Sequence, residues 1–283
     1  MKKITLVFSL LFVSTMFFTS CKDVLEEITK TTTDTTKIAQ GLKEALQLGT
    51  ESAVTKLNAT DGYFRDAAVK ILLPQELQNA ISTFKSKSFT VLGKTYTGET
   101  IYSTGVPLLG LNPLKSKEDD LILGLNKAAE AAAAEAKPIF VNAITGMSIS
   151  DASGILFGGV DTAATNYLRK TTYANLYTKF EPKIDNSLKT VKIGDKAVAT
   201  LYENFIQDYN SILNKSVGLG LGSVGSLMDI KTITTTDLSA YTTNKGLSGL
   251  FLKVSDKEAE IRKDPLARVN DLLKDVFGKL DKK

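Results

Sequence analysis

Apolar residues recur through most of this chain at three- and four-residue steps, the spacing of one face of an α-helix. The clearest run covers residues 37–57. Most later runs begin at Ser, Asp or Pro, which favour the first positions of a helix. We therefore expect a mainly α fold, with a single multi-helix domain. The further predicted helices begin at Pro74, Ser116, Ser148 or Ser150, Asp161, Asp195, Asp237 and Pro265, with a break near Pro182 in the helix that follows Asp161.

Two segments depart from the helical spacing. Residues 88–104 are rich in Thr, Tyr, Val and Ile, which favour strands, and Gly93 and Gly98 supply turn positions. This composition predicts a small β-hairpin inserted between helices. Residues 216–226 are rich in glycine and predict a loop.

The N-terminal residues have the pattern of an export signal. Two lysines precede an uncharged, mostly apolar segment over 4–18, which predicts a signal peptide over 1–20. The segment is short for a bilayer-spanning helix, although an uncleaved helical anchor is the alternative. Its end, FTSC at 18–21, resembles the lipobox of bacterial lipoproteins. That resemblance implies cleavage before Cys21 and acylation of this cysteine by fatty acids such as palmitate.

Acylation of Cys21 would attach the protein to a membrane of the cell envelope, the outer membrane above all. Stable attachment needs more than one acyl chain, and lipoprotein processing supplies them. Lys22 and Asp23 resemble, over a short match, the charged signals of surface-exposed lipoproteins of the Bacteroidetes. Whether the protein faces the periplasm or the cell surface stays open. Residues 21–37, rich in threonine, are predicted to form a lipidated tether that spans about 20–25 Å as a flexible coil.

The residue types that are rare in this chain exclude several kinds of chemistry. It contains no histidine and one cysteine, so imidazole bases, imidazole metal ligands and intramolecular disulfides are impossible. Without Lys2 and Lys3 the net charge of +4 falls close to neutrality, which gives no reason to expect a nucleic-acid partner. We expect no metal, no cofactor and no catalytic residues.

Two short motifs match enzyme signatures only in part. GLGSVG at 220–225 fits G-x-G-x-x-G, but a helix precedes it and residues 240–247 hold no acid, which favours a loop. STFK at 82–85 fits the S-x-x-K motif of penicillin-binding proteins, whose S-D-N and K-T-G elements are missing. The carboxylates Glu130 and Glu135 lie five residues apart, on different faces of one helix.

A basic, aromatic stripe is the candidate binding surface. Arg169, Tyr173 and Tyr177 lie four residues apart and share one helix face. They are either the edge of the core or a surface for an anionic or glycan-like ligand, since Arg and Tyr are favoured contact residues.

Several stretches together resemble one family, the domain-of-unknown-function family numbered 4197, found in exported proteins of Gram-negative bacteria. The resemblance covers most of residues 38–280, with 86–115 as an apparent insertion and a further departure at 214–233. It implies an exported, mainly helical domain and no assigned activity. The stretches are GLKEAL at 41–46, DGYF at 61–64, LLP at 72–74, NKAAEAA at 126–132, EAKPIF at 135–140, GGVDTAAT at 158–165, YLR at 167–169 and GLF at 249–251.

These observations predict a membrane-anchored envelope lipoprotein whose helical domain, over 38–281, binds an envelope ligand or protein without catalysis. The alternative is a hydrolase or transferase that acts on envelope polymers through carboxylates or the Ser82 and Lys85 pair. A third possibility is a lipoprotein with a purely structural role.

Overall fold

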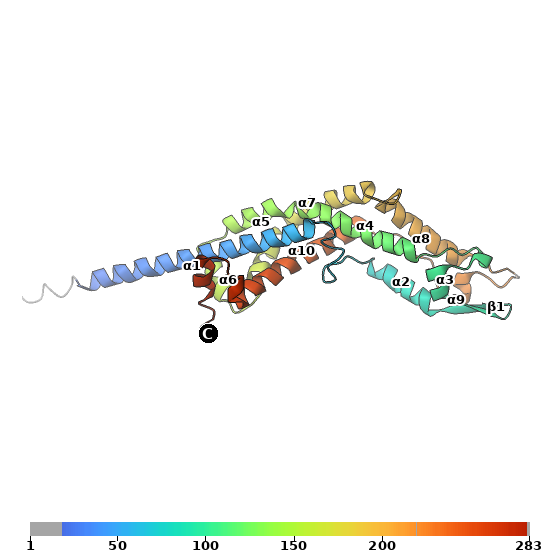
Figure 1. Cartoon of the computed structure of the whole chain (residues 1–283), viewed down its shortest axis with the longest axis horizontal. Coiled ribbons are helices and arrows are strands. Elements are labelled where there is room, and N and C mark those ends of the chain that lie inside the picture. The colour runs from blue at the N-terminus through green and yellow to red at the C-terminus, as the bar shows by residue number, and fades with distance from the viewer. Residues whose placement is uncertain (1–18, 219, 282–283) are drawn as a thin grey trace, which may run out of the picture.

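The structure, a computed structural model, describes residues 19–281 except residue 219, and it describes side chains from residue 34 onward. The predicted signal peptide therefore lies outside the described residues, apart from Thr19 and Ser20. The fold is mainly α, as the sequence predicts, and elongated (Figure 1). Its helices are α1 (Thr19–Asn58), α2 (Gln75–Ser86), α3 (Gly98–Thr104), α4 (Lys115–Ala133), α5 (Ala136–Thr145), α6 (Ile149–Phe157), α7 (Ala163–Thr190), α8 (Val198–Asn214), α9 (Val224–Met228), α10 (Leu238–Lys263) and α11 (Asp271–Phe277).

The chain runs along the long axis several times. α1 leads from one end to the middle of the molecule, and α2 continues toward the opposite end, where the hairpin, α3 and α9 lie (Figure 1). α4 and α5 return along the molecule, α7 and α8 run outward again, and α10 returns to pack on α7 and α1. α6 and α11 lie beside the middle of α1, whose first half projects beyond them.

The threonine-rich segment is helical, which differs from the flexible tether that the sequence predicts. α1 is continuous from Thr19 to Asn58, so residues 21–37 form its first half. Threonine has modest helix propensity, but a helix grows by adding one hydrogen bond per residue to a turn already formed. The second half supplies that start because Leu42, Leu46 and Leu57 are buried against the rest of the domain. A helix from Cys21 to Lys37 spans about 24 Å, which is within the span of about 20–25 Å expected for a flexible coil. The segment therefore differs from the predicted tether in stiffness and not in length.

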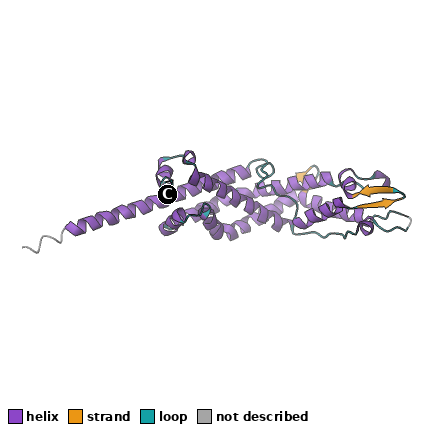
Figure 2. Cartoon of the chain, turned by 90° about the horizontal axis from the view of Figure 1, so that it is seen from below, coloured by secondary structure: helices purple, strands orange, loops and turns teal. Residues whose placement is uncertain are grey.

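The predicted hairpin is present but shorter than expected. β1 (Ser88–Val91) pairs antiparallel with β2 (Lys94–Thr97), and Figure 2 shows both strands at the far end of the molecule. The second half of the predicted hairpin is instead α3, which begins after Thr97, whose hydroxyl accepts the backbone N–H of Thr100. A β-branched residue thus acts here as a helix cap.

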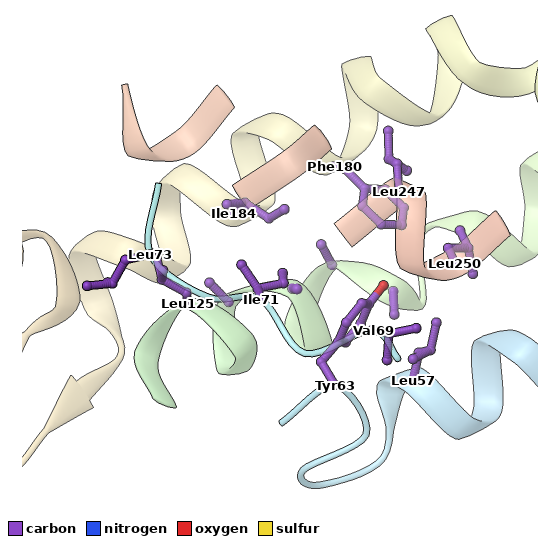
Figure 3. Close-up of a cluster of buried hydrophobic side chains, with 14 of the residues drawn as sticks. Leu57, Tyr63, Val69, Ile71, Leu73, Leu125, Phe180, Ile184, Leu247 and Leu250 are labelled. Atoms are coloured by element: carbon purple, nitrogen blue, oxygen red, sulfur yellow. The ribbon is translucent and has the colours of Figure 1, made fainter. Parts of the chain in front are cut away.

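Alanines on α4 let it pack closely against its neighbours. Ala128, Ala129, Ala132 and Ala133 are fully buried, and α4 contacts both α7 and α10. Larger side chains fill the space around them in the middle of the molecule, where segments from α1, α4, α7 and α10 meet (Figure 3). This is the central joint of the fold.

Three predicted helix boundaries are wrong for local reasons. α7 continues through Pro182, because Phe180 and Ile184 on either side are buried in the core and hold the helix together. Asp195 does not begin a helix; it follows Gly194, which has a φ of 65°, in a turn between the short strands β3 (Lys192–Ile193) and β4 (Lys196–Ala197). The last helix, α11, begins at Asp271 with Asn270 as its cap, not at Pro265, which opens a 3₁₀ turn.

Candidate functional site

The predicted stripe lies along the seam between α7 and α10. The Arg169 guanidinium carbon is 4.7 Å from the centre of the Phe251 ring, and the Tyr173 ring stacks on the same ring at 6.4 Å. The Tyr173 hydroxyl donates to Asn244 at 2.6 Å. Tyr177 is half-buried beside them, and burial raises its hydroxyl pKa. The three residues are thus brought together, with Arg169 exposed above a buried aromatic ring.

A groove lies on the other flank of α7, against α5. Its volume is about 400 Å³. A buried row of α7, which includes Leu168, Thr172 and Leu176, separates its floor from the stripe. The groove is lined by Ile139, Asn142, Ala143, Gly146, Tyr167, Thr171, Thr172 and Asn175.

The groove lining is polar but carries no ionisable acid or amine. The Thr171 hydroxyl donates to the carbonyl of Tyr167 at 2.9 Å, which leaves its oxygen lone pairs as acceptors. Within the part of the chain that the structure describes, the side-chain amides of Asn142 and Asn175 have no hydrogen-bond partner. Burial raises the pKa of the Tyr167 hydroxyl, which therefore stays protonated and can donate. Sequence reasoning missed this groove because its residues are ordinary surface types.

The residues proposed for catalysis are not assembled into a catalytic site. Ser82 is exposed, while the Lys85 ammonium pairs with Glu99 at 3.1 Å and lies over the Tyr102 ring. Glu135 pairs with Lys183 at 3.2 Å, and Glu130 is buried, so the two carboxylates do not form an acid–base pair. Lys85 and Glu135 are thus held in ion pairs with groups outside the proposed catalytic pairs.

A second, smaller groove of about 280 Å³ lies between α7, α8 and the start of α10. It contains carboxylates, but two of them are engaged. Asp185 pairs with Lys189 at 2.7 Å, and Asp237 accepts the backbone N–H of Ala240 as the cap of α10. This groove offers no pair of free carboxylates.

Glu258 is the charged residue that sequence reasoning missed. It reaches from α10 to the start of α7, where it accepts the backbone N–H groups of Ala164 at 3.0 Å and Thr165 at 2.7 Å. Its partner Arg262 donates to it at 2.9 Å and also to the carbonyls of Ile155 and Leu156, both at 3.1 Å. This buried pair joins three helices, a structural task. Asp161, the predicted cap of α7, instead pairs with Lys263.

The central joint is held by a second buried polar cluster. The Asn126 side chain bonds both the N–H and the C=O of Ile71, each at 2.8 Å, and the Tyr63 hydroxyl donates to the carbonyl of Gly246 at 2.8 Å. One oxygen of the buried Glu130 has no partner, and burial raises its pKa while the nearby N–H groups of Asp61 and Tyr63 oppose the shift. These groups fix the loop between α1 and α2.

Among the side chains that the structure describes, no group of His, Cys, Asp and Glu could hold a metal ion. No single helix in the described chain is long and apolar enough to cross a membrane. α5 and α6 together reach that length, but the chain bends by 101° between them.

The fold and these surfaces define an elongated, mainly α protein whose buried charges join helices and whose open groove is uncharged. A family model matches the chain over residues 32–94 and 107–278, and the unmatched 95–106 lies inside the predicted insertion. The chain therefore belongs to the family described as "Protein of unknown function (DUF4197)". In comparisons with curated proteins and with solved structures, nothing matches it.

Proposed function

We propose that this protein is a lipid-anchored envelope protein that binds a neutral, hydroxyl-rich ligand, such as a glycan, in the groove between α5 and α7. The observation that carries the proposal is the composition of that groove. Its amide, hydroxyl and phenol groups can exchange hydrogen bonds with sugar hydroxyls, and the Tyr167 ring can cover an apolar sugar face.

The same composition favours binding over catalysis. Hydrolysis of a glycoside by the usual route needs two carboxyl groups across the scissile bond, and no carboxyl group lines this groove. General acid–base catalysis near neutral pH also favours histidine, which the chain lacks. A bound glycan would therefore remain intact.

The stripe on the opposite flank of α7 extends the proposal to charged ligands. Arg169 is exposed, and stacking on Phe251 leaves the edges of its guanidinium available to an anion. Arg169, Tyr173 and Tyr177 thus remain predicted contacts for an acidic group, separate from the neutral groove.

The groove is tested by single substitutions on α7. The purified protein is titrated with a panel of neutral oligosaccharides, and the Kd is measured. Asn175→Ala or Tyr167→Ala should raise the Kd about tenfold, the loss expected for one or two hydrogen bonds or a stacked ring. Asn186→Ala is the matched control, because Asn186 is equally exposed on α7 and lies outside the groove. Failure of every neutral oligosaccharide to bind, or equal losses in Asn175→Ala and Asn186→Ala, would reject the groove as the site.

The anchor is tested at Cys21. Expressed in a Gram-negative host, the protein should incorporate labelled fatty acid and fractionate with membranes, and Cys21→Ser should abolish both. A serine variant that remains labelled and membrane-bound would contradict lipidation at this residue.

A further inference from the structure

Among the chain turns at the end of the molecule farthest from the start of α1, two carry strongly exposed leucines, and we call these two the distal tip: the hairpin turn at 92–93 and the segment 105–111. Figures 1 and 2 place the hairpin and α3 at this end. Segment 105–111 follows α3 directly and contains the 3₁₀ turn Pro107–Leu109. Lys215, at the end of α8, lies beside it, because a Cβ on Gly110 would be 3.4 Å from the Lys215 Nζ.

The hairpin turn carries a leucine that neither packing nor turn geometry favours. Leu92 is 84% exposed, although its strand neighbours Phe89 and Val91 are buried. Its φ is 51°, and that of Gly93 is 77°, so both central residues of the turn adopt the left-handed region. Such turns favour Asn or Gly at the first position, because a larger side chain there is sterically strained. Strain at an exposed apolar residue is a reason to look for a function.

The second turn presents a leucine in the same way. Leu108 is 81% exposed, and it lies between Val106 and Leu111, both of which are buried. The Val106 N–H donates to the Leu111 carbonyl at 2.7 Å, and the Leu111 N–H returns a bond at 3.2 Å. The base of the turn is therefore fixed, and Leu108 is held outward from it.

Two lysines lie next to these leucines, Lys94 directly after the hairpin turn and Lys215 beside Gly110, and Lys87 lies at the base of the hairpin. Across the described residues, none of Lys87, Lys94 and Lys215 forms an ion pair, although most lysines elsewhere in the domain do. Along the chain, the acids nearest to these lysines are Glu76, Glu99 and Asp208. Glu76 lies at the opposite end of α2, Glu99 pairs with Lys85, and Asp208 pairs with Lys117, while Asp229 is exposed after α9. The tip therefore carries a local positive charge around exposed apolar side chains.

We propose that the distal tip docks on an anionic lipid bilayer, with Leu92 and Leu108 inserted at the acyl boundary and Lys87, Lys94 and Lys215 on the head groups. Two narrow turns with one leucine each offer little continuous area for a protein partner, which needs a broad complementary patch. A fluid apolar layer has no such requirement, and anionic head groups match the unpaired lysines.

Because the tip and the start of α1 lie at opposite ends, this proposal has a geometric consequence (Figure 1). A chain held to one membrane by its N-terminus would present its tip to a different membrane surface. The inference is independent of the glycan groove, since it involves no residue of α5 or α7.

A vesicle-capture experiment tests the proposal with the full chain. The protein is reconstituted through its N-terminal segment into phosphatidylcholine vesicles, and dye-labelled acceptor vesicles that contain phosphatidylglycerol are added. The acceptors should co-float with the protein-bearing vesicles, whereas phosphatidylcholine acceptors should not. Leu92→Asn and Leu108→Ser should each reduce capture about tenfold, and together about a hundredfold.

The controls separate docking from folding. Leu92→Asn suits the left-handed turn better than leucine, so its far-UV spectrum and stability should be retained while capture falls. Leu266→Ser is the matched surface control, because Leu266 is 91% exposed near the other end of the molecule. Unchanged capture in the Leu92→Asn, Leu108→Ser double variant, or equal loss in Leu266→Ser, would overturn the proposal. Capture only of acceptors that also carry the protein would overturn it in favour of contact between two copies.

Discussion

Replacing Glu258 with glutamine should destabilise the domain far more than any change at a surface carboxylate. The exposed fractions of the Glu258 and Arg262 side chains are 6% and 5%. Glu258→Gln keeps the side-chain shape but removes the charge that Arg262 faces. Ala164 and Thr165 donate to different oxygens of Glu258, so the glutamine also turns its amide N–H₂ toward one of these two backbone donors.

The expected loss follows from the cost of leaving one buried charge unpaired, about 3–5 kcal/mol in the free energy of unfolding. For a domain of this size, each kcal/mol lowers the Tm by about 2–4 °C, so a decrease of roughly 6–20 °C is expected. The matched control is Glu260→Gln, since Glu260 pairs with Lys257 at 2.8 Å but is 48% exposed. Exposed pairs contribute at most about 1 kcal/mol.

Urea unfolding followed by far-UV circular dichroism measures both variants. The buried pair should also be insensitive to salt, because little water reaches it. If Glu258→Gln and Glu260→Gln differ by less than about 1 kcal/mol, the buried pair does not hold the start of α7, and the reasoning fails.

Two further predictions concern the central joint. Asn126→Ala leaves the buried N–H and C=O of Ile71 without partners and should lower the free energy of unfolding, measured in urea, by about 2–4 kcal/mol. Asn210→Ala breaks a similar but half-buried pair of bonds to Ile233 and should lower it by less. Equal losses in the two variants would contradict the argument from burial. The hydrogen bond from Lys253 holds the pKa of Asp66 below its ordinary value of 3.8, so its stabilisation is present above that pH and is lost as the pH falls through the lowered pKa. Asp66→Asn should therefore lower the Tm at neutral pH but not at pH values below the Asp66 pKa, and a Tm difference that persists unchanged in acid would refute this sign.

The sequence predicted those parts of the fold that depend on neighbouring residues. Ser148 and Asp237 cap α6 and α10 as expected, because a cap bonds a backbone N–H only a few positions away. The start of α7 could not be predicted in this way, since its cap, Glu258, lies more than ninety residues further along the chain. The same holds for Asn126, whose polar side chain reads as a surface residue in an alanine-rich helix until Ile71 is placed beside it.

In the candidate site, too, the features within one helix could be predicted and those that need two helices could not. The stripe of Arg169, Tyr173 and Tyr177 was visible because four-residue spacing brings side chains together within one helix. The groove was not, because it needs α5 and α7 side by side, and Asn142 and Asn175 are common surface residues with no distinctive spacing. Turn strain at Leu92 was equally hidden, since φ is not readable from composition.

Because α1 is continuous, the segment that follows Cys21 sets both the distance of the domain from Cys21 and the rotation of the domain about the helix axis. In a coil, an inserted residue changes neither in a defined way. In a helix, each residue added between Cys21 and the bundle raises the domain by about 1.5 Å and turns it by about 100°. Adding seven residues would raise it by about 10 Å and return it to within about 20° of its original facing, whereas adding two would turn the α5–α7 groove toward the opposite side. If Cys21 holds the chain to a membrane, the number of helical residues between Cys21 and the bundle determines which face of the elongated domain points in which direction.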